Sequence, residues 1–255
     1  LSQALTAFRH RFMRQKIYIH GNPQATELER LAYFGGRTEC FFIGRKTSGP
    51  FYKLDVNSMY PAIMSKLSVP VKFIRMYKWF DVSKLKFAIK RWAVVADVVI
   101  ETRKRCYPVR GKDGLIFPIG KFRTALCGPE LALALRHGDI VSVDRLAVYR
   151  KRVIFDRFVT ELYAIRQQYE RAGNPVFAEM TKRLMNTLYG KFGQHNEQWE
   201  YLGHFPQAED GVWTVYDEET GEHYQERCVF GHVFRQVGMQ DAYHSFAGIS
   251  AYITS

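Results

Sequence analysis

The sequence lacks the features that define several protein classes. It has no run of about 18 apolar residues, so no membrane partner is expected. Its four cysteines are scattered without paired spacing, which argues against a zinc ribbon or a disulfide framework and fits a reducing compartment. Cys228 and His232 stand at helical spacing, but a pair without two further ligands does not indicate a metal site.

Acidic residues are also few compared with basic ones. The chain has 25 Asp and Glu against 37 Lys and Arg, which gives a net charge of +12. Such an excess attracts polyanions, so nucleic acid is the first partner to test, although charge alone leaves a merely soluble basic protein open. Aromatic residues make up 15% of the chain, and some stand beside basic ones, but we expect most of them in the core.

The hydrophobic pattern predicts a mixture of helices and strands. Helices are expected near the N-terminus, over Gln24–Ala32, Pro129–Leu135, 154–170 and Val176–Tyr189, and from about Asp241 onward. Strands are expected over Thr38–Ile43, Phe51–Val56, Trp92–Ile100, Trp199–Leu202, Val212–Tyr216 and His223–Phe230, with loops and short hairpins over Tyr107–Gly128. The turn Gly173-Asn174-Pro175 predicts that the helices on either side of it are antiparallel neighbours, and Asp217–Gly221 predicts a hairpin turn.

One informative stretch runs from Asp55 to Pro61, where a predicted strand delivers a carboxylate to its end and the chain then turns. An Asp in this position can hold a divalent cation, while N–H groups of the turn face triphosphate oxygens. Tyr60 would then lie under the sugar, where its ring can reject a ribose by meeting the 2′-hydroxyl. Taken alone, the Asp is more often a turn cap, so both interpretations stay open at this point.

A second stretch runs from Lys182 to Gly190. On a helix, Lys182, Asn186 and Tyr189 share one face, because they stand at i, i+4 and i+7. The Lys could neutralise charge on a transferring phosphoryl group, and Gly190 would let another chain approach closely. The alternative is a solvated polar face whose Gly is a C-cap.

Together the two stretches resemble motif A (Asp-x-x-Ser-Leu-Tyr-Pro) and motif B (Lys-x-x-x-Asn-Ser-x-Tyr-Gly) of family B DNA polymerases, in the family's order. Met59 replaces the usual Leu and Thr187 the usual Ser, and neither change removes a required chemical group. Tyr33-Phe34-Gly35-Gly36 resembles the junction between exonuclease and polymerase parts, which contacts template in this family. Asn57 and Gly190-Lys191-Phe192 are typical of its protein-primed branch in phages, adenoviruses and linear plasmids.

The resemblance implies a role for each matching residue. It implies metal ligation by Asp55 and the Val56 carbonyl, with Mg²⁺ as a pair of ions, and catalytic roles for Asp55 and Lys182. The implied nucleotide-binding residues are Asn57, Ser58, Met59, Tyr60, Arg166, Lys182, Asn186 and Tyr189. The implied DNA-binding residues are Tyr33, Gly35, Gly36, Arg37, Gly190 and Lys191. Arg171 competes with Arg166 for the triphosphate, because the turn near Gly173 lengthens the segment between the helices.

Two carboxylate motifs of the family are missing. Two-metal phosphoryl transfer needs carboxylates from a later Tyr-x-Asp-Thr-Asp segment, motif C, which the sequence lacks. The nearest imitation, Tyr216–Thr220, has the adjacent acids of an exposed turn, and no Asp-x-Glu exonuclease pair precedes Tyr33. We therefore expect a fragment, truncated before motif C, that does not polymerise alone, because Asp55 by itself cannot hold two cations.

The resemblance implies an α+β fold, with a partial polymerase palm, inserted two-helix fingers and β-rich insertions. The expected parts are the end of a linker with the junction (1–36), the first palm part with motif A (37–105), an insertion resembling a first terminal-protein region (106–152), fingers with motif B (153–193), a β-hairpin insertion resembling a second terminal-protein region (194–236) and the start of a second palm part (237–255).

The expected function is DNA-directed DNA synthesis by the parent enzyme in viral, plasmid or organellar replication. Its partners would be a DNA template and primer, deoxynucleoside triphosphates and, if priming uses a protein, a terminal protein. The alternative is a non-catalytic nucleic-acid-binding remnant of such a polymerase, which explains the positive charge equally well.

Overall fold

The computed structural model describes residues 2–111, 114–217, 221 and 223–255. These residues form two compact units, one reaching to Gly193 and including Phe246–Ser255, the other comprising Gln194–Ser245. Helices and antiparallel sheets are mixed in the chain, which confirms the predicted α+β class. Within the described residues, no helix combines the length and the apolar character needed to span a membrane.

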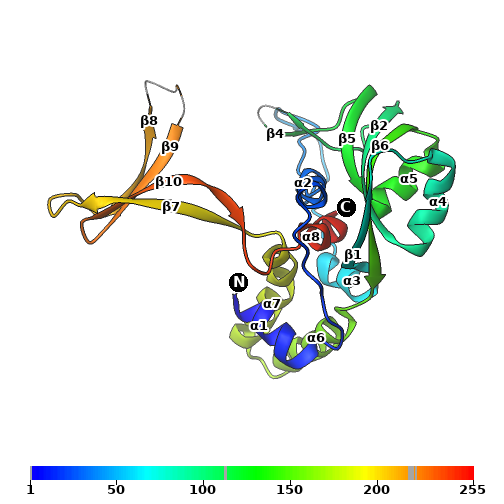
Figure 1. Ribbon diagram of the computed structural model, residues 1–255. Coiled ribbons are helices and arrows are strands. Elements are labelled where there is room, and N and C mark those ends of the chain that lie inside the picture. The colour runs from blue at the N-terminus through cyan, green and yellow to red at the C-terminus, as the bar shows by residue number, and fades with distance from the viewer. Residues whose placement is uncertain (1, 112–113, 218–220, 222) are drawn as a thin grey trace. The chain divides into compact units, whose positions relative to one another are not determined.

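The first unit is built on a four-stranded antiparallel sheet in the order β1-β6-β2-β5 (Figure 1). Its strands are β1 (Val69–Tyr77), β2 (Ala93–Thr102), β5 (Gly120–Cys127) and β6 (Ile140–Arg152). The Val-rich strand predicted over Trp92–Ile100 is confirmed, because β2 pairs with β5 on one side and β6 on the other. A short ribbon of β3 (Val109–Gly111) and β4 (Gly114–Ile116) separates β2 from β5 along the chain.

Helices cover both faces of this sheet, which explains why β2 is apolar at nearly every position. Val94, Ala96 and Val98 point to one face and join a core with α4 (Val82–Arg91) and α5 (Gly128–His137). Ala93 and Val95 point to the other face, toward α2 (Pro23–Leu31) and α8 (Ala247–Thr254) (Figure 1). The sheet therefore lies between two apolar layers, one on each face.

A group of helices packs beside this second layer. It comprises α1 (Ser2–Ala7), a π-helical turn (Phe8–Phe12), α3 (Met59–Lys66), α6 (Asp156–Arg171) and α7 (Pro175–Phe192). α6 and α7 lie side by side, and Asn174 caps α7 by accepting a hydrogen bond from the Phe177 N–H at 3.3 Å. The predicted turn at Gly173–Pro175 is therefore confirmed, with Asn as N-cap and Pro at the first helical position.

The second unit is a four-stranded antiparallel sheet in the order β7-β10-β9-β8. Its strands are β7 (His195–His204), β8 (Gly211–Tyr216), β9 (His223–Val229) and β10 (His232–Asp241). On one of its faces, the Arg227 guanidinium stacks over the rings of Trp199 and Phe234, at 4.2 and 5.1 Å. The three strands predicted in this region are confirmed, and the predicted turn falls partly outside the described residues, at 218–220.

Several sequence predictions are wrong. The segments Thr38–Ile43 and Phe51–Val56 form no strand, because among the described residues neither has a neighbouring strand with which to pair. β1, β6, α3 and α4 were not predicted, since their mixed polarity hides the period. β5 lies where loops and short hairpins were predicted from the density of Gly and Pro. The last helix begins at Ala247 instead of near Asp241, because β10 continues to Asp241.

Glu130, in the first turn of α5, makes stability depend on pH. Burial raises the pKa of Glu130 from 4.5 to about 7, although a hydrogen bond from the Cys127 N–H partly opposes the rise. Since the folded pKa is the higher one, the stabilisation is full below pH 4.5 and is lost as the pH rises through 7. Part of the residue is still exposed, which moderates the effect.

We expect this carboxyl group to lower the free energy of unfolding by about 1–3 kcal/mol between mildly acidic and mildly alkaline pH. Glu130→Gln should remove that dependence, because glutamine keeps an oxygen for the Cys127 N–H but has no proton to release. Urea unfolding of both proteins at a series of pH values measures the difference. Parallel stability curves for the two proteins would contradict the assignment.

Candidate functional site

The turn before α3 is held against α6. Ser58 adopts the left-handed conformation at φ 53°, and α3 starts at the next residue. The Ser58 Oγ accepts a hydrogen bond from Arg166 Nη1 at 3.3 Å, and α3 packs against α6. Ser58 of the first motif and Arg166 of α6, two residues predicted to bind the nucleotide, are thereby brought together.

Three tyrosines from three separate motifs form one cluster. The rings of Tyr60 and Tyr189 are 5.0 Å apart and tilted by 36°. Burial raises the pKa of Tyr189, and the neighbouring hydroxyls of Tyr60 and Tyr33 raise it further. Burial also raises the pKa of Tyr33, with Arg30 opposing and Tyr60 adding to the effect. The hydroxyls of Tyr33 and Tyr189, whose pKa is raised, therefore stay protonated near neutral pH and can donate hydrogen bonds.

Gly36 explains how the junction motif can approach this cluster. A Cβ atom at Gly36 would collide with the Tyr60 hydroxyl, so a larger residue there would require the Tyr60 side chain to shift. Gly35 has φ +80°, a left-handed conformation that glycine adopts freely. Arg37 next to them stacks over the Phe117 ring at 4.1 Å and pairs with Glu39. Tyr33 and Gly36 of the Tyr-x-Gly-Gly segment thus lie beside Tyr60.

A cavity of about 360 Å³ opens between α6 and α7. Arg166 and Glu170 of α6 line it on one side, and Glu179 and Lys182 of α7 on the other. Arg171, the competing candidate, is exposed at the end of α6 and does not line this cavity. Arg166 and Lys182 are therefore the two cations that face a common space.

Both cations of the cavity are engaged by carboxylates. Arg166 Nε donates to Glu170 Oε1 at 2.8 Å, and Lys182 Nζ lies 3.4 Å from Glu179 Oε2. A hydrogen bond from Arg183 and then the charge of Lys182 lower the pKa of Glu179. These pairs are exposed and so contribute little stability, which means that a more highly charged anion can replace the glutamates. Glu170 and Glu179 were missed as site residues, although their i, i+4 and i, i+3 spacing from these cations is visible in the sequence.

The remaining residues of the second motif lie along α7. Asn186 and Lys191 are half-buried, and Met185 and Leu188 fill the core on the opposite face. Gly190 lies inside the helix and a Cβ there would meet open space, whereas Gly193 is the C-cap. The alternative that Gly190 is a C-cap is therefore wrong, and the helix surface at Gly190 is open to an approaching chain.

Asp55 does not lie at the end of a strand, contrary to prediction. The residues around it form no helix or strand and are exposed, and Leu54 and Val56 are 90% and 65% accessible. Asn57 and Met59 are exposed as well. Within the described part of the chain, no three His, Cys, Asp or Glu residues are grouped so that they could hold a metal ion. Asp55 and the Val56 carbonyl thus offer two oxygen ligands, close in sequence to Ser58 and Tyr60.

Comparison with known proteins extends these findings. Residues 2–203 match the family model described as DNA polymerase type B, organellar and viral. A probable DNA polymerase of Ascobolus immersus is 28% identical over 174 residues, which cover 64% of this chain and 13% of the relative. The DNA-directed DNA polymerase of Enterobacteria phage PRD1 is 27% identical over 178 residues, covering 68% and 30%. The chain spans less than a third of the length of these relatives.

A solved structure has the same fold. Phi29 DNA polymerase, in a complex with primer-template DNA and incoming nucleotide, superimposes with a TM-score of 0.61 over 99% of this chain and 43% of its own, at 16% sequence identity. Another crystal form of the same polymerase gives a TM-score of 0.58.

Proposed function

This chain belongs to the organellar and viral type B DNA polymerases, and we propose that it forms the nucleotide-binding part of such an enzyme. The proposed reaction adds deoxynucleotides to a 3′ or protein-primed hydroxyl, directed by a DNA template. The family match confirms the resemblance drawn from the ordered motifs. The observation that carries the proposal is the cavity that Arg166 and Lys182 share, joined to Ser58 by the Arg166 hydrogen bond.

Each part of an incoming nucleotide has residues that suit it. The triphosphate suits Arg166 and Lys182, because guanidinium and ammonium groups form strong charge-assisted hydrogen bonds with phosphate oxygens. N–H groups of the turn at Asn57–Met59 could add to them. The sugar suits the face of Tyr60, and Asn186 and Tyr189 would border the base. Tyr33, Gly35, Gly36, Arg37, Gly190 and Lys191 are proposed to contact the DNA.

Divalent metal use follows from the family in general, and Mg²⁺ is the proposed ion. Asp55 and the Val56 carbonyl are oxygen donors, which Mg²⁺ prefers, and both are accessible. When bound, such ions neutralise the charge of a triphosphate and of the attacking hydroxyl. One carboxylate and one carbonyl fit part of an octahedral ligand set, so water and the triphosphate would have to complete it.

Sugar discrimination tests this proposal. We expect the chain to bind a deoxynucleoside triphosphate about tenfold more tightly than the matching ribonucleotide, because a 2′-hydroxyl would meet the Tyr60 ring. Tyr60→Val should make the two affinities nearly equal, mainly by admitting the ribonucleotide. Fluorescence titration with labelled nucleotides in the presence of Mg²⁺ measures both constants. A wild-type chain that binds neither nucleotide, or an unchanged ratio in Tyr60→Val, would contradict it.

The proposed partners are DNA template and primer, deoxynucleoside triphosphates and, for the protein-primed branch, a terminal protein. The parts predicted over 106–152 and 194–236 remain the proposed counterparts of the first and second terminal-protein regions, although the second compact unit extends to Ser245. A non-catalytic nucleic-acid-binding remnant is the second candidate. The observation that favours it is the exposed Asp55, which belongs to no metal-binding group among the described residues.

A further inference from the structure

A second, larger cavity lies at one end of the sheet, away from the finger helices. It measures about 780 Å³, a size that suits a nucleotide unit, and shares no lining residue with the cavity between α6 and α7. The end of β2, the chain after it, the start of β5 and the connection from α5 to β6 line this cavity. None of the proposed nucleotide-binding residues takes part in it.

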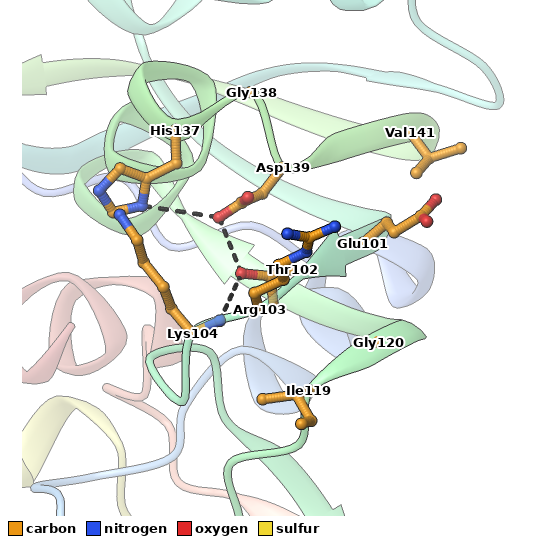
Figure 2. A pocket seen from close by; sticks show the side chains of 10 residues that line it. All are labelled: Glu101, Thr102, Arg103, Lys104, Ile119, Gly120, His137, Gly138, Asp139 and Val141. Atoms are coloured by element: carbon orange, nitrogen blue, oxygen red, sulfur yellow. Dashed lines mark hydrogen bonds and ion pairs between the residues drawn. The ribbon is translucent and has the colours of Figure 1, made fainter.

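The Asp139 carboxylate is the centre of a hydrogen-bond network in the cavity. Its Oδ2 accepts hydrogen bonds from the Tyr107 hydroxyl at 2.7 Å and from Thr102 Oγ1 at 3.1 Å, and His137 Nδ1 lies at 3.5 Å. Tyr107 is fully buried, so it is a fixed donor to this carboxylate. Gly138, with φ +73°, turns the chain so that His137 and Asp139 face each other. The carboxylate is thus bound internally, and His137 is held in one orientation at the edge of the cavity (Figure 2).

The cations at this cavity lack such partners. Arg103 and Lys104 are exposed, and within the described residues neither has a side-chain ion pair or hydrogen bond. Figure 2 shows Arg103, Lys104 and His137 around Asp139, with Val141 near Glu101 at one edge and Ile119 near Gly120 at another. The exposed fractions of Ile119 and Val141 are 60% and 45%. The cavity therefore combines free positive charge with an accessible aliphatic surface.

We propose that this cavity binds a phosphate group of a nucleic acid strand, with the phosphate at Arg103, Lys104 and His137. The adjoining sugar and base would contact Ile119 and Val141. Glu101, at another edge in Figure 2, favours this ligand over an acidic peptide, because its carboxylate can accept a hydrogen bond from a base, a group that acidic side chains do not offer. The chain would then bind nucleic acid at a site separate from its proposed nucleotide-binding cavity.

The test compares two variants that remove the same charge from the same unit. Arg103→Ala/Lys104→Ala removes the cavity cations, and Lys84→Ala/Lys86→Ala removes two exposed lysines of α4 that do not line the cavity. Binding of a labelled oligothymidylate of about 12 nucleotides is followed by fluorescence anisotropy at several salt concentrations. We expect the cavity variant to bind about tenfold more weakly with a salt slope reduced by about 1.4, and the control to change about twofold. His137→Gln should weaken binding in the same direction.

Competition identifies the source of the phosphate. In one outcome, millimolar inorganic phosphate displaces the oligonucleotide from the wild-type chain but not from Arg103→Ala/Lys104→Ala. That result would support the site and show that free phosphate is a sufficient ligand. No displacement at matched ionic strength would support the strand as the ligand. Equal losses in the two double variants, or displacement by oligoglutamate as effective as by unlabelled oligothymidylate, would overturn the proposal. Binding of a deoxynucleoside triphosphate at the cavity between α6 and α7 should be unchanged in all these variants. Failure of this inference can therefore be distinguished from failure of the proposed function.

Discussion

Replacing Glu29 with alanine is expected to lower the free energy of unfolding by about 3–5 kcal/mol, a large share of the stability of an ordinary domain. Glu29 is only 2% exposed. Its carboxylate accepts hydrogen bonds from the Tyr149 hydroxyl at 2.7 Å and from the Gly248 N–H at 3.1 Å, and His20 Nε2 lies at 2.8 Å. It therefore connects α2 with β6 and with the first turn of α8.

Alanine would leave these three buried polar groups without their partner, and each would lose its hydrogen bond without regaining water. Glu27→Ala, two positions earlier on α2, is the matched control. Its side chain is 56% exposed and pairs with Arg145, which keeps its contact with Asp97 when Glu27 is removed. Urea unfolding should show a loss below about 1 kcal/mol for Glu27→Ala. Similar losses for the two variants would mean that the Glu29 network contributes little.

Parts of the fold with a strong local signal could be predicted from sequence. β2 was recognised because a strand covered on both faces must be apolar throughout. The helix pair α6 and α7 was recognised because Asn174 and Pro175 are a cap and a first helical residue. β1 and β6 were not, because their residues alternate irregularly around bulges, and the pairing that defines them joins distant segments.

The segment around Asp55 shows a limit of another kind. Phe51–Val56 has the residue types of a half-buried strand, but a strand forms only where another chain segment pairs with it. Spacing brought Lys182 and Asn186 to one helix, because a helix is a local structure. It could not reveal the contact between Ser58 and Arg166, which depends on how α3 packs against α6.

The same reasoning applies to the larger cavity. Thr102, Tyr107 and Asp139 are ordinary polar residues in the sequence, and only the antiparallel pairing of β2 with β6 brings them together. Predictable sites are therefore those in which one element carries most of the chemistry. Sites assembled from the ends of several strands need the folded structure.

Removing Arg166 and Lys182, the two cations of the cavity between α6 and α7, is expected to have the largest effect on nucleotide binding. Arg166→Ala/Lys182→Ala should weaken binding of a deoxynucleoside triphosphate about 100-fold, because two charge-assisted contacts to phosphate are lost, each contributing about 1.4 kcal/mol. Isothermal titration calorimetry with Mg²⁺ present measures the change. Release of Glu170 and Glu179 from their ion pairs should add to it, since both carboxylates would then face the triphosphate uncompensated.

Arg157→Ala/Arg183→Ala is the matched control for this variant, because it removes the same charge from the same two helices. Arg157 pairs with Glu161 and Arg183 with Glu179, yet neither arginine lines the cavity. If long-range attraction alone held the nucleotide, both double variants would lose the same affinity, by no more than a few fold at physiological salt. A difference of an order of magnitude or more between them requires direct contact, because of these four cations only Arg166 and Lys182 line the cavity between α6 and α7. Equal losses would remove the cavity as the triphosphate site and leave the positive charge of the chain as the sole attraction for nucleotides.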